Sequence, residues 1–160
     1  MPTNKKSGKN VAPKSAKKTP AQKTTPGVKP KLPAKLPTTI APWLCLRGGA
    51  RAVEFYKKAF GVVEVFRLDG GSSVVAKLSV HGAEFWLSDE SPEHHNHSPE
   101  TLGGITTRII FTVSDPDTVF ARAIAAGAKE IYPVGDEHGW RIGRVVDPFG
   151  PHWEIGRPLE

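Results

Sequence analysis

The sequence has almost no cysteine, no long apolar run and no signal-like N-terminus. Cys45 is the only cysteine, which excludes an internal disulfide and removes any need for an oxidising compartment. No apolar run approaches the ~18 residues that indicate a membrane span, and the first residues lack the apolar stretch of a signal peptide. The sequence therefore predicts a cytoplasmic protein that makes no membrane contact.

The first 38 residues lack acidic, aromatic and arginine side chains. They hold ten of the 22 lysines and arginines, so the remaining residues carry 12 basic against 16 acidic groups. A segment rich in Lys, Pro and Ala buries too little apolar surface to offset its chain entropy. We expect residues 1–38 to be a disordered basic tail and residues 39–160 to form one domain. The tail is either a solubilising extension or a weak contact to a polyanion such as nucleic acid.

An internal repeat organises the domain. The apolar stretch 42–46 leads through two glycines into an amphipathic segment at 52–61, and the stretch 109–113 leads through a short turn into a similar segment at 119–127. Each half therefore predicts a strand, a turn and a helix of about three turns that ends at a glycine.

Three short strands are predicted after each helix, because side-chain alternation recurs between turn signals. They cover 62–68, 73–80 and 83–87 in the first half and 129–133, 141–146 and 152–155 in the second. The expected fold is therefore α+β, with two βαβββ repeats. A turn is expected from Gly135 to Gly139, and a long polar connector from Asp89 to Gly104.

Three motifs in this frame resemble those of one known superfamily. They are AVEFYKKAFG at 52–61, SPETLGG at 98–104, and RVVDPFG at 144–150 followed by Trp153. Together they resemble the glyoxalase, bleomycin-resistance and dihydroxybiphenyl dioxygenase superfamily, also called vicinal oxygen chelate, and look most like its PhnB-like branch. The resemblance implies a cup-shaped sheet with helices outside and a small-molecule cavity inside. Function is a separate question, because one fold hosts many chemistries.

The resemblance also implies a metal position with two ligands from each half. The equivalent residues here are Ala41, Trp86, Arg108 and Glu154. Only Glu154 is able to bind a divalent ion, because alanine has no ligand atom, an indole N–H only donates and a guanidinium repels cations. We therefore expect no metal and no cofactor at this position, which argues against metal-dependent glyoxalase or dioxygenase chemistry.

The polar connector carries three histidines, His94, His95 and His97. Flexible histidine-rich loops bind metals opportunistically, so we interpret the segment first as a connector between the halves. A metal site at these histidines, or a lid over the cavity mouth, are the alternatives.

Side-chain alternation predicts that Phe85, Leu87, Trp153 and Ile155 face the core, and that the residues between them on the last strands face the cavity. The side chains at 41, 86, 108 and 154 are expected to converge on one enclosed space. There Arg108 and Glu154 are expected to form an ion pair that either replaces the metal structurally or lets Arg108 grip an anion while Glu154 orients it or acts as a base. The tryptophans offer flat walls, and His152 points the same way as Glu154. The predicted ligand-binding residues are Trp43, Trp86, Arg108, Trp140, Arg141, His152 and Glu154.

Three functions remain open from the sequence. The leading hypothesis is a homodimer that binds a small organic ligand, including an anionic one, without a metal, as drug-sequestering members of the superfamily do. The first alternative is a lyase or isomerase of glyoxalase type that is metal-free, with Glu154 as the catalytic base, or uses a non-standard metal site. The second alternative is association with nucleic acid through the basic tail.

Overall fold

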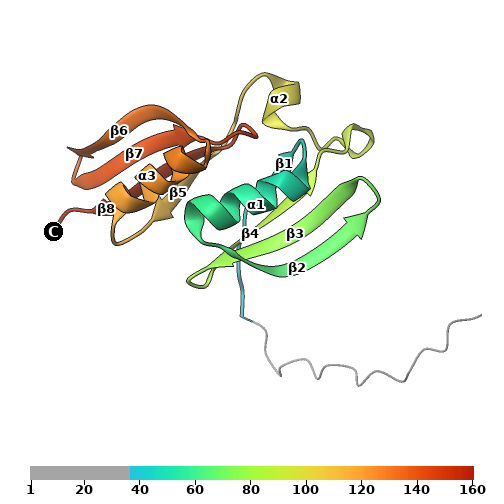
Figure 1. Ribbon diagram of the computed structural model, residues 1–160, viewed down its shortest axis with the longest axis horizontal. Coiled ribbons are helices and arrows are strands. Elements are labelled where there is room, and N and C mark those ends of the chain that lie inside the picture. The colour runs from blue at the N-terminus through green and yellow to red at the C-terminus, as the bar shows by residue number, and fades with distance from the viewer. Residues whose placement is uncertain (1–36) are drawn as a thin grey trace, which may run out of the picture. The chain divides into compact units, whose positions relative to one another are not determined.

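The computed structural model describes residues 37–160, of which Thr39–Glu160 form one compact unit (Figure 1). The tail expected at 1–38 lies outside the described residues except for its last two. The first half contains β1 (Trp43–Leu46), α1 (Gly49–Phe60), β2 (Val63–Gly70), β3 (Ser73–Val80) and β4 (Ala83–Asp89). The second contains β5 (Arg108–Thr112), α3 (Pro116–Ala126), β6 (Lys129–Glu137), β7 (Trp140–Val146) and β8 (His152–Pro158).

The predicted pair of βαβββ repeats is confirmed. Each half forms a four-stranded sheet, in the order β1-β4-β3-β2 and β5-β8-β7-β6, and in each the first strand runs parallel to the last. Figure 1 shows α1 against the first sheet and α3 against the second, with the sheets side by side. Between residues 37 and 160 no helix is long and apolar enough to cross a bilayer.

Two segments differ from the sequence prediction. The turn expected from Gly135 to Gly139 is shorter, because bulges in β6 bring Gly135 opposite Ile142 and leave only His138 and Gly139 in the turn. The connector contains a short 3₁₀ helix (Pro92–His94) and α2 (Pro99–Leu102). It is tied down by Glu90, whose carboxylate accepts from Arg47, Ser98 and Thr101.

The first turn of α1 is capped by a residue that is distant in sequence. Gly48 precedes the helix and has no side chain to offer, so Asp89 at the end of β4 accepts hydrogen bonds from the backbone N–H groups of Gly48 and Gly49, both at 2.9 Å. A Cβ at Gly49 would lie 2.6 Å from Val74, so only glycine fits there. Helix α3 is capped locally, because Asp115 accepts from the N–H of Thr118.

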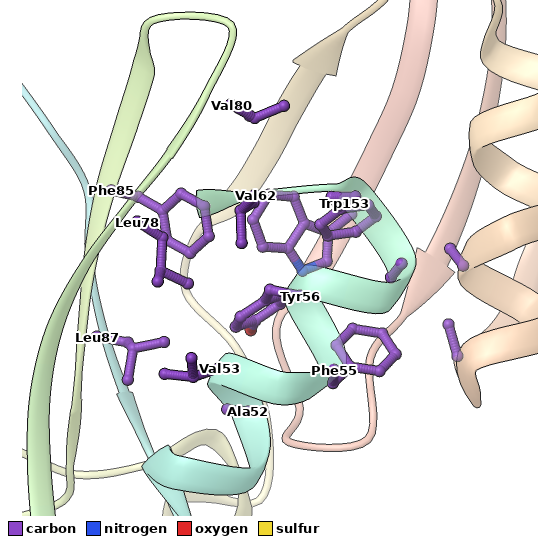
Figure 2. Close-up of a cluster of buried hydrophobic side chains, with 14 of the residues drawn as sticks. Ala52, Val53, Phe55, Tyr56, Val62, Leu78, Val80, Phe85, Leu87 and Trp153 are labelled. Carbon is purple, nitrogen blue, oxygen red and sulfur yellow. The ribbon is translucent and has the colours of Figure 1, made fainter. Parts of the chain in front are cut away.

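The helix-facing sides of both sheets share one core. The residues predicted for the core face, Phe85, Leu87, Trp153 and Ile155, are all buried. Trp153, from β8, lies in Figure 2 beside Tyr56 of α1, with ring centroids 5.4 Å apart, although the two belong to different halves. Its ring also packs on Phe60 at 4.6 Å. The two repeats are therefore held together by packing around α1 rather than by strand pairing.

A buried carboxylate reinforces this junction. One oxygen of Asp147 accepts from the Tyr56 hydroxyl at 2.7 Å and from the Trp153 indole N–H at 2.8 Å, and the other accepts from the N–H of Phe149. Burial nevertheless dominates, and it raises the pKa of Asp147 from the ordinary 3.8 to about 6. The hydrogen bonds oppose this rise only in part.

The raised pKa of Asp147 predicts a specific dependence of stability on pH. Because the folded chain holds this proton more tightly than the unfolded chain, the contribution is complete below pH 3.8 and is lost as the pH rises through about 6. We expect the free energy of unfolding to fall by about 2–3 kcal/mol from this group over that interval. Urea unfolding at a series of pH values should show the decline, and Asp147→Asn should remove it. An unchanged slope in the variant would assign the decline to other groups.

Candidate functional site

The helix-free face of the first sheet carries a row of aromatic side chains. Trp43, Trp86, Lys77 and Phe66 lie opposite one another on four neighbouring strands. The rings of Trp43 and Trp86 are stacked with centroids 5.4 Å apart, and Phe66 lies 5.6 Å from Trp86. We call these three rings the aromatic plate. The Lys77 ammonium lies 5.6 Å from the centre of the Trp86 ring, within range of a cation–π contact.

The aromatic plate is open on its outer side. Trp43 is 54% exposed and Phe66 is 46% exposed, while the Trp43 indole N–H is fixed by a 3.0 Å hydrogen bond to the hydroxyl of Ser88. A large aromatic surface that is both oriented and exposed is a typical contact surface for a ligand or another chain.

The helix-free face of the second sheet forms a pocket of about 680 Å³. The lining is mainly apolar but contains charged groups, and it includes Arg108, Ile110, Tyr132, Trp140, Arg144 and Glu154. This combination of an apolar wall and a few polar groups is usual for small-molecule sites.

The expected ion pair between Arg108 and Glu154 is present, with 2.5 Å between Nη1 and Oε1. Glu154 lies directly opposite Arg144 in the sheet, but makes its salt bridge to Arg108 instead. Arg144 donates to Nδ1 of His152, at 2.8 Å from Nη2. Burial, then the neighbouring Arg144 and Arg108, lower the pKa of His152, so its ring is neutral and able to accept.

The structure brings only some of the predicted site residues together. Arg108, Trp140 and Glu154 line the pocket, and His152 adjoins it through Arg144. Arg141 points to the other face of the sheet, where its guanidinium pairs with Asp117 of α3 and with Asp136. These two carboxylates raise the pKa of Arg141 further.

The prediction that the side chains at 41, 86, 108 and 154 converge on one enclosed space is wrong for a single chain. Trp43 and Trp86 lie on the first sheet, whereas the pocket with Arg108 and Glu154 is lined only by residues of the second half. Because the halves pack through α1 and the Trp153 core, the two helix-free faces are not joined into one cup within the chain. The residues predicted for the cavity are therefore divided between two faces.

The four residues expected at the metal position, Ala41, Trp86, Arg108 and Glu154, do not fit a divalent ion. Of the four, Glu154 alone has a donor oxygen, and that carboxylate is bound to Arg108. In the part of the chain from 37 to 160, no three His, Cys, Asp or Glu side chains are grouped to hold an ion. Nδ1 of His94 contacts the hydroxyl of Ser91, and His97 lines a separate, smaller pocket of about 350 Å³. The connector contributes nothing to the larger pocket.

Several residues that line the pocket were not predicted from the sequence, namely Tyr132, His138, Ile142 and Arg144. The signal for Arg144 was available. Side chains alternate along β7, so a wall that includes Trp140 also includes Ile142 and Arg144 and leaves Arg141 outside.

Two four-stranded sheets, each with a helix packed against one side, are the architecture expected of two βαβββ repeats. The profile of the Glyoxalase/Bleomycin resistance protein/Dioxygenase superfamily matches residues 44–155. The chain belongs to this superfamily.

Similar proteins were found by sequence and by structure. An uncharacterised protein of Mycobacterium bovis is 38% identical over 126 residues, covering 75% of this chain and 83% of that protein. TioX from Micromonospora sp. ML1 is 29% identical, with a TM-score of 0.61 over 76% of this chain and 100% of TioX. TnmS3, an antibiotic binding protein from Streptomyces sp. CB03234, shares the fold with a TM-score of 0.59 at 16% identity, over 78% of this chain and 98% of TnmS3.

Proposed function

We propose that this chain binds a small organic ligand in the pocket of the second sheet without a metal ion. The proposal is carried by a mainly apolar pocket of about 680 Å³ that is lined with a few charged groups, while residues 37–160 contain no chelating set. TnmS3, which shares the fold, is an antibiotic binding protein. The fold is therefore compatible with binding that needs no chemical step.

A homodimer would complete the site, and the sheet edges support it. The backbones of Pro42 and Leu46 bond to β4, so those of Trp43 and Cys45 face the other way. Within residues 37–160 nothing pairs with that edge of β1, nor with the corresponding edge of β5. The opposite edges, β2 and β6, are bulged, which is a common protection against pairing.

The exposed apolar side chains lie on the same two faces. Ile110 is 62% exposed and Tyr132 is 61% exposed on the second sheet, and the aromatic plate is similarly open on the first. In the proposed dimer, β1 of one copy lies beside β5 of the other. The aromatic plate of each copy then forms the wall opposite the pocket of its partner. Each site would contain residues from both copies.

Further assignments from the sequence stay proposals. The motif at 98–104 and the DPFG segment at 147–150 support placement in the PhnB-like branch. A cytoplasmic location stays a prediction. The polyanion contact of the basic tail concerns residues 1–36, which lie outside the described residues.

A thermal-shift screen tests the binding proposal. The full-length chain is heated with a panel of aromatic and aliphatic carboxylates, alcohols and amines, and separately with Zn²⁺, Ni²⁺ and Mn²⁺. A ligand at 100 times its Kd should stabilise the fold by about 2.7 kcal/mol, and we expect organic hits that Ile142→Arg abolishes. Strong stabilisation by a metal ion alone, with no organic hit, would contradict a metal-free binder.

An enzyme is the second candidate, because Glu154 projects into the pocket. Oε1 of Glu154 accepts from Arg108, whereas no side chain between residues 37 and 160 donates to Oε2 of Glu154. A carboxylate placed in this way is able to accept a proton from carbon, with the two arginines near the charge that develops. Screen hits incubated with the chain in D₂O should then exchange hydrogen, and Glu154→Gln should stop the exchange. Ligands that remain unexchanged and intact favour the binder.

A further inference from the structure

Arg144 is a cation in the pocket that has no acidic partner among residues 37–160. Within that range its side-chain hydrogen bonds go only to Nδ1 of His152, at 3.2 Å from Nε and 2.8 Å from Nη2. No carboxylate of the described residues lies within 4.0 Å of its guanidinium, although Glu154 is its direct neighbour across the strands. The carboxylate that would satisfy Arg144 is engaged by Arg108.

A half-buried guanidinium with a neutral partner is incompletely compensated. Arginine usually meets carboxylates or phosphates through two parallel N–H groups, and His152 accepts at a single nitrogen. The charge of Arg144 has been partly removed from water without receiving an opposite charge in return. An anion that enters the pocket would supply it.

The surroundings of Arg144 restrict what the anion carries. The ring of Tyr132, the direct neighbour of Arg144 on β6, lies on the same face. The ring of Trp140 also lies there, and Ile142 stands between Trp140 and Arg144 along β7. Flat apolar groups stack or pack favourably against such a wall. Trp140 and Arg144 lie on the same face of β7, so one ligand is able to meet both.

The charge of the pocket favours a monoanion. Arg108 and Glu154 neutralise each other, and Arg144 then adds one positive charge. Glu137 also lines the pocket, but it is exposed at the end of β6, where water and salt screen its charge. A carboxylate matches this single guanidinium, whereas a doubly charged group would leave one negative charge without a partner.

We infer that the ligand of this site is a small planar aromatic carboxylate, and that Arg144, not Arg108, anchors its carboxylate. This inference rests on the proposed function and deepens it, since it names the class of ligand and the residue that selects the class. Arg108 keeps Glu154 neutralised and so leaves Arg144 available. His152 holds the guanidinium in position until the ligand replaces or joins it.

The test compares one acid with its neutral counterpart. The probes are 2-naphthoate and 2-naphthylmethanol, which share the ring system and differ in charge, and their Kd values are measured by titration calorimetry. Wild-type chain should bind the acid at least ~10-fold more tightly than the alcohol, because charge-assisted hydrogen bonds are the stronger ones. Arg144→Met should weaken binding of the acid by ~10–100-fold and change the Kd of the alcohol by less than ~3-fold. Arg144→Lys should keep part of the preference, since it retains charge without the fork.

Arg157→Met is the matched control. Arg157 also has no carboxylate of the described residues within 4.0 Å, but it lies opposite Arg141 on the other face of the sheet. It should leave both Kd values unchanged, and thermal unfolding confirms that each variant is folded. Equal affinity of wild-type chain for acid and alcohol, or undiminished acid binding by Arg144→Met, would refute the inference while leaving a ligand pocket in place. Binding of neither probe would also refute it, and the proposed function would then be judged by the wider screen.

Discussion

Replacing Trp153 with alanine is expected to lower the free energy of unfolding by about 4 kcal/mol. Trp153 is 3% exposed, and its ring packs on Tyr56, Phe60 and Phe85. The change leaves a cavity at the junction of the two repeats. It also removes one of the hydrogen bonds that compensate the buried carboxylate of Asp147.

Urea unfolding of the variant measures this effect, and two further substitutions separate its parts. Trp153→Phe keeps most of the ring and should cost about 1–2 kcal/mol, mainly for the lost indole N–H. Trp140→Ala removes a tryptophan from the pocket wall, outside the buried core, and should cost less than about 1 kcal/mol. A loss below about 1 kcal/mol for Trp153→Ala would mean that the halves are not joined through this residue.

Two variants that each abolish ligand binding are expected to restore it when mixed. Trp86→Arg places a charge on the aromatic plate, and Ile142→Arg blocks the pocket of the second sheet. In a mixed dimer, one site receives both substitutions and the other receives neither. After subunit exchange, about a quarter of all sites should therefore bind a hit from the screen with wild-type affinity.

The control for this experiment uses two substitutions in the same half. Ile110→Arg and Ile142→Arg both alter the pocket of the second sheet, so no arrangement of the mixed dimer contains an intact site. This mixture should stay inactive. Recovery in the control, or its absence in the first mixture after verified exchange, would contradict a site shared between copies.

Much of the fold could be predicted because the repeat and the alternation are both local signals. The two-residue period assigned Phe85, Leu87, Trp153 and Ile155 to the core, and all four are buried. The same period, applied from Trp140, would have selected Arg144 instead of Arg141. That choice depended on sequence adjacency, which on a strand means opposite faces.

Other features depend on contacts between distant segments, which no single motif encodes. Asp89 caps α1 from the far end of β4, and Glu90 fixes the connector through Arg47. The choice of Arg108 rather than Arg144 as the partner of Glu154 is likewise decided by side-chain geometry. Above all, the packing around Trp153 determines that the helix-free faces do not close into one cup within the chain.

The mass of the full-length chain in solution tests the central claim most directly. We expect light scattering at micromolar concentration to show a particle with the mass of two 17.3 kDa chains. On dilution, the binding of organic ligands should fall in parallel with the fraction of chains in that particle. A particle with the mass of one chain that binds a ligand in the second-sheet pocket at full affinity would contradict it.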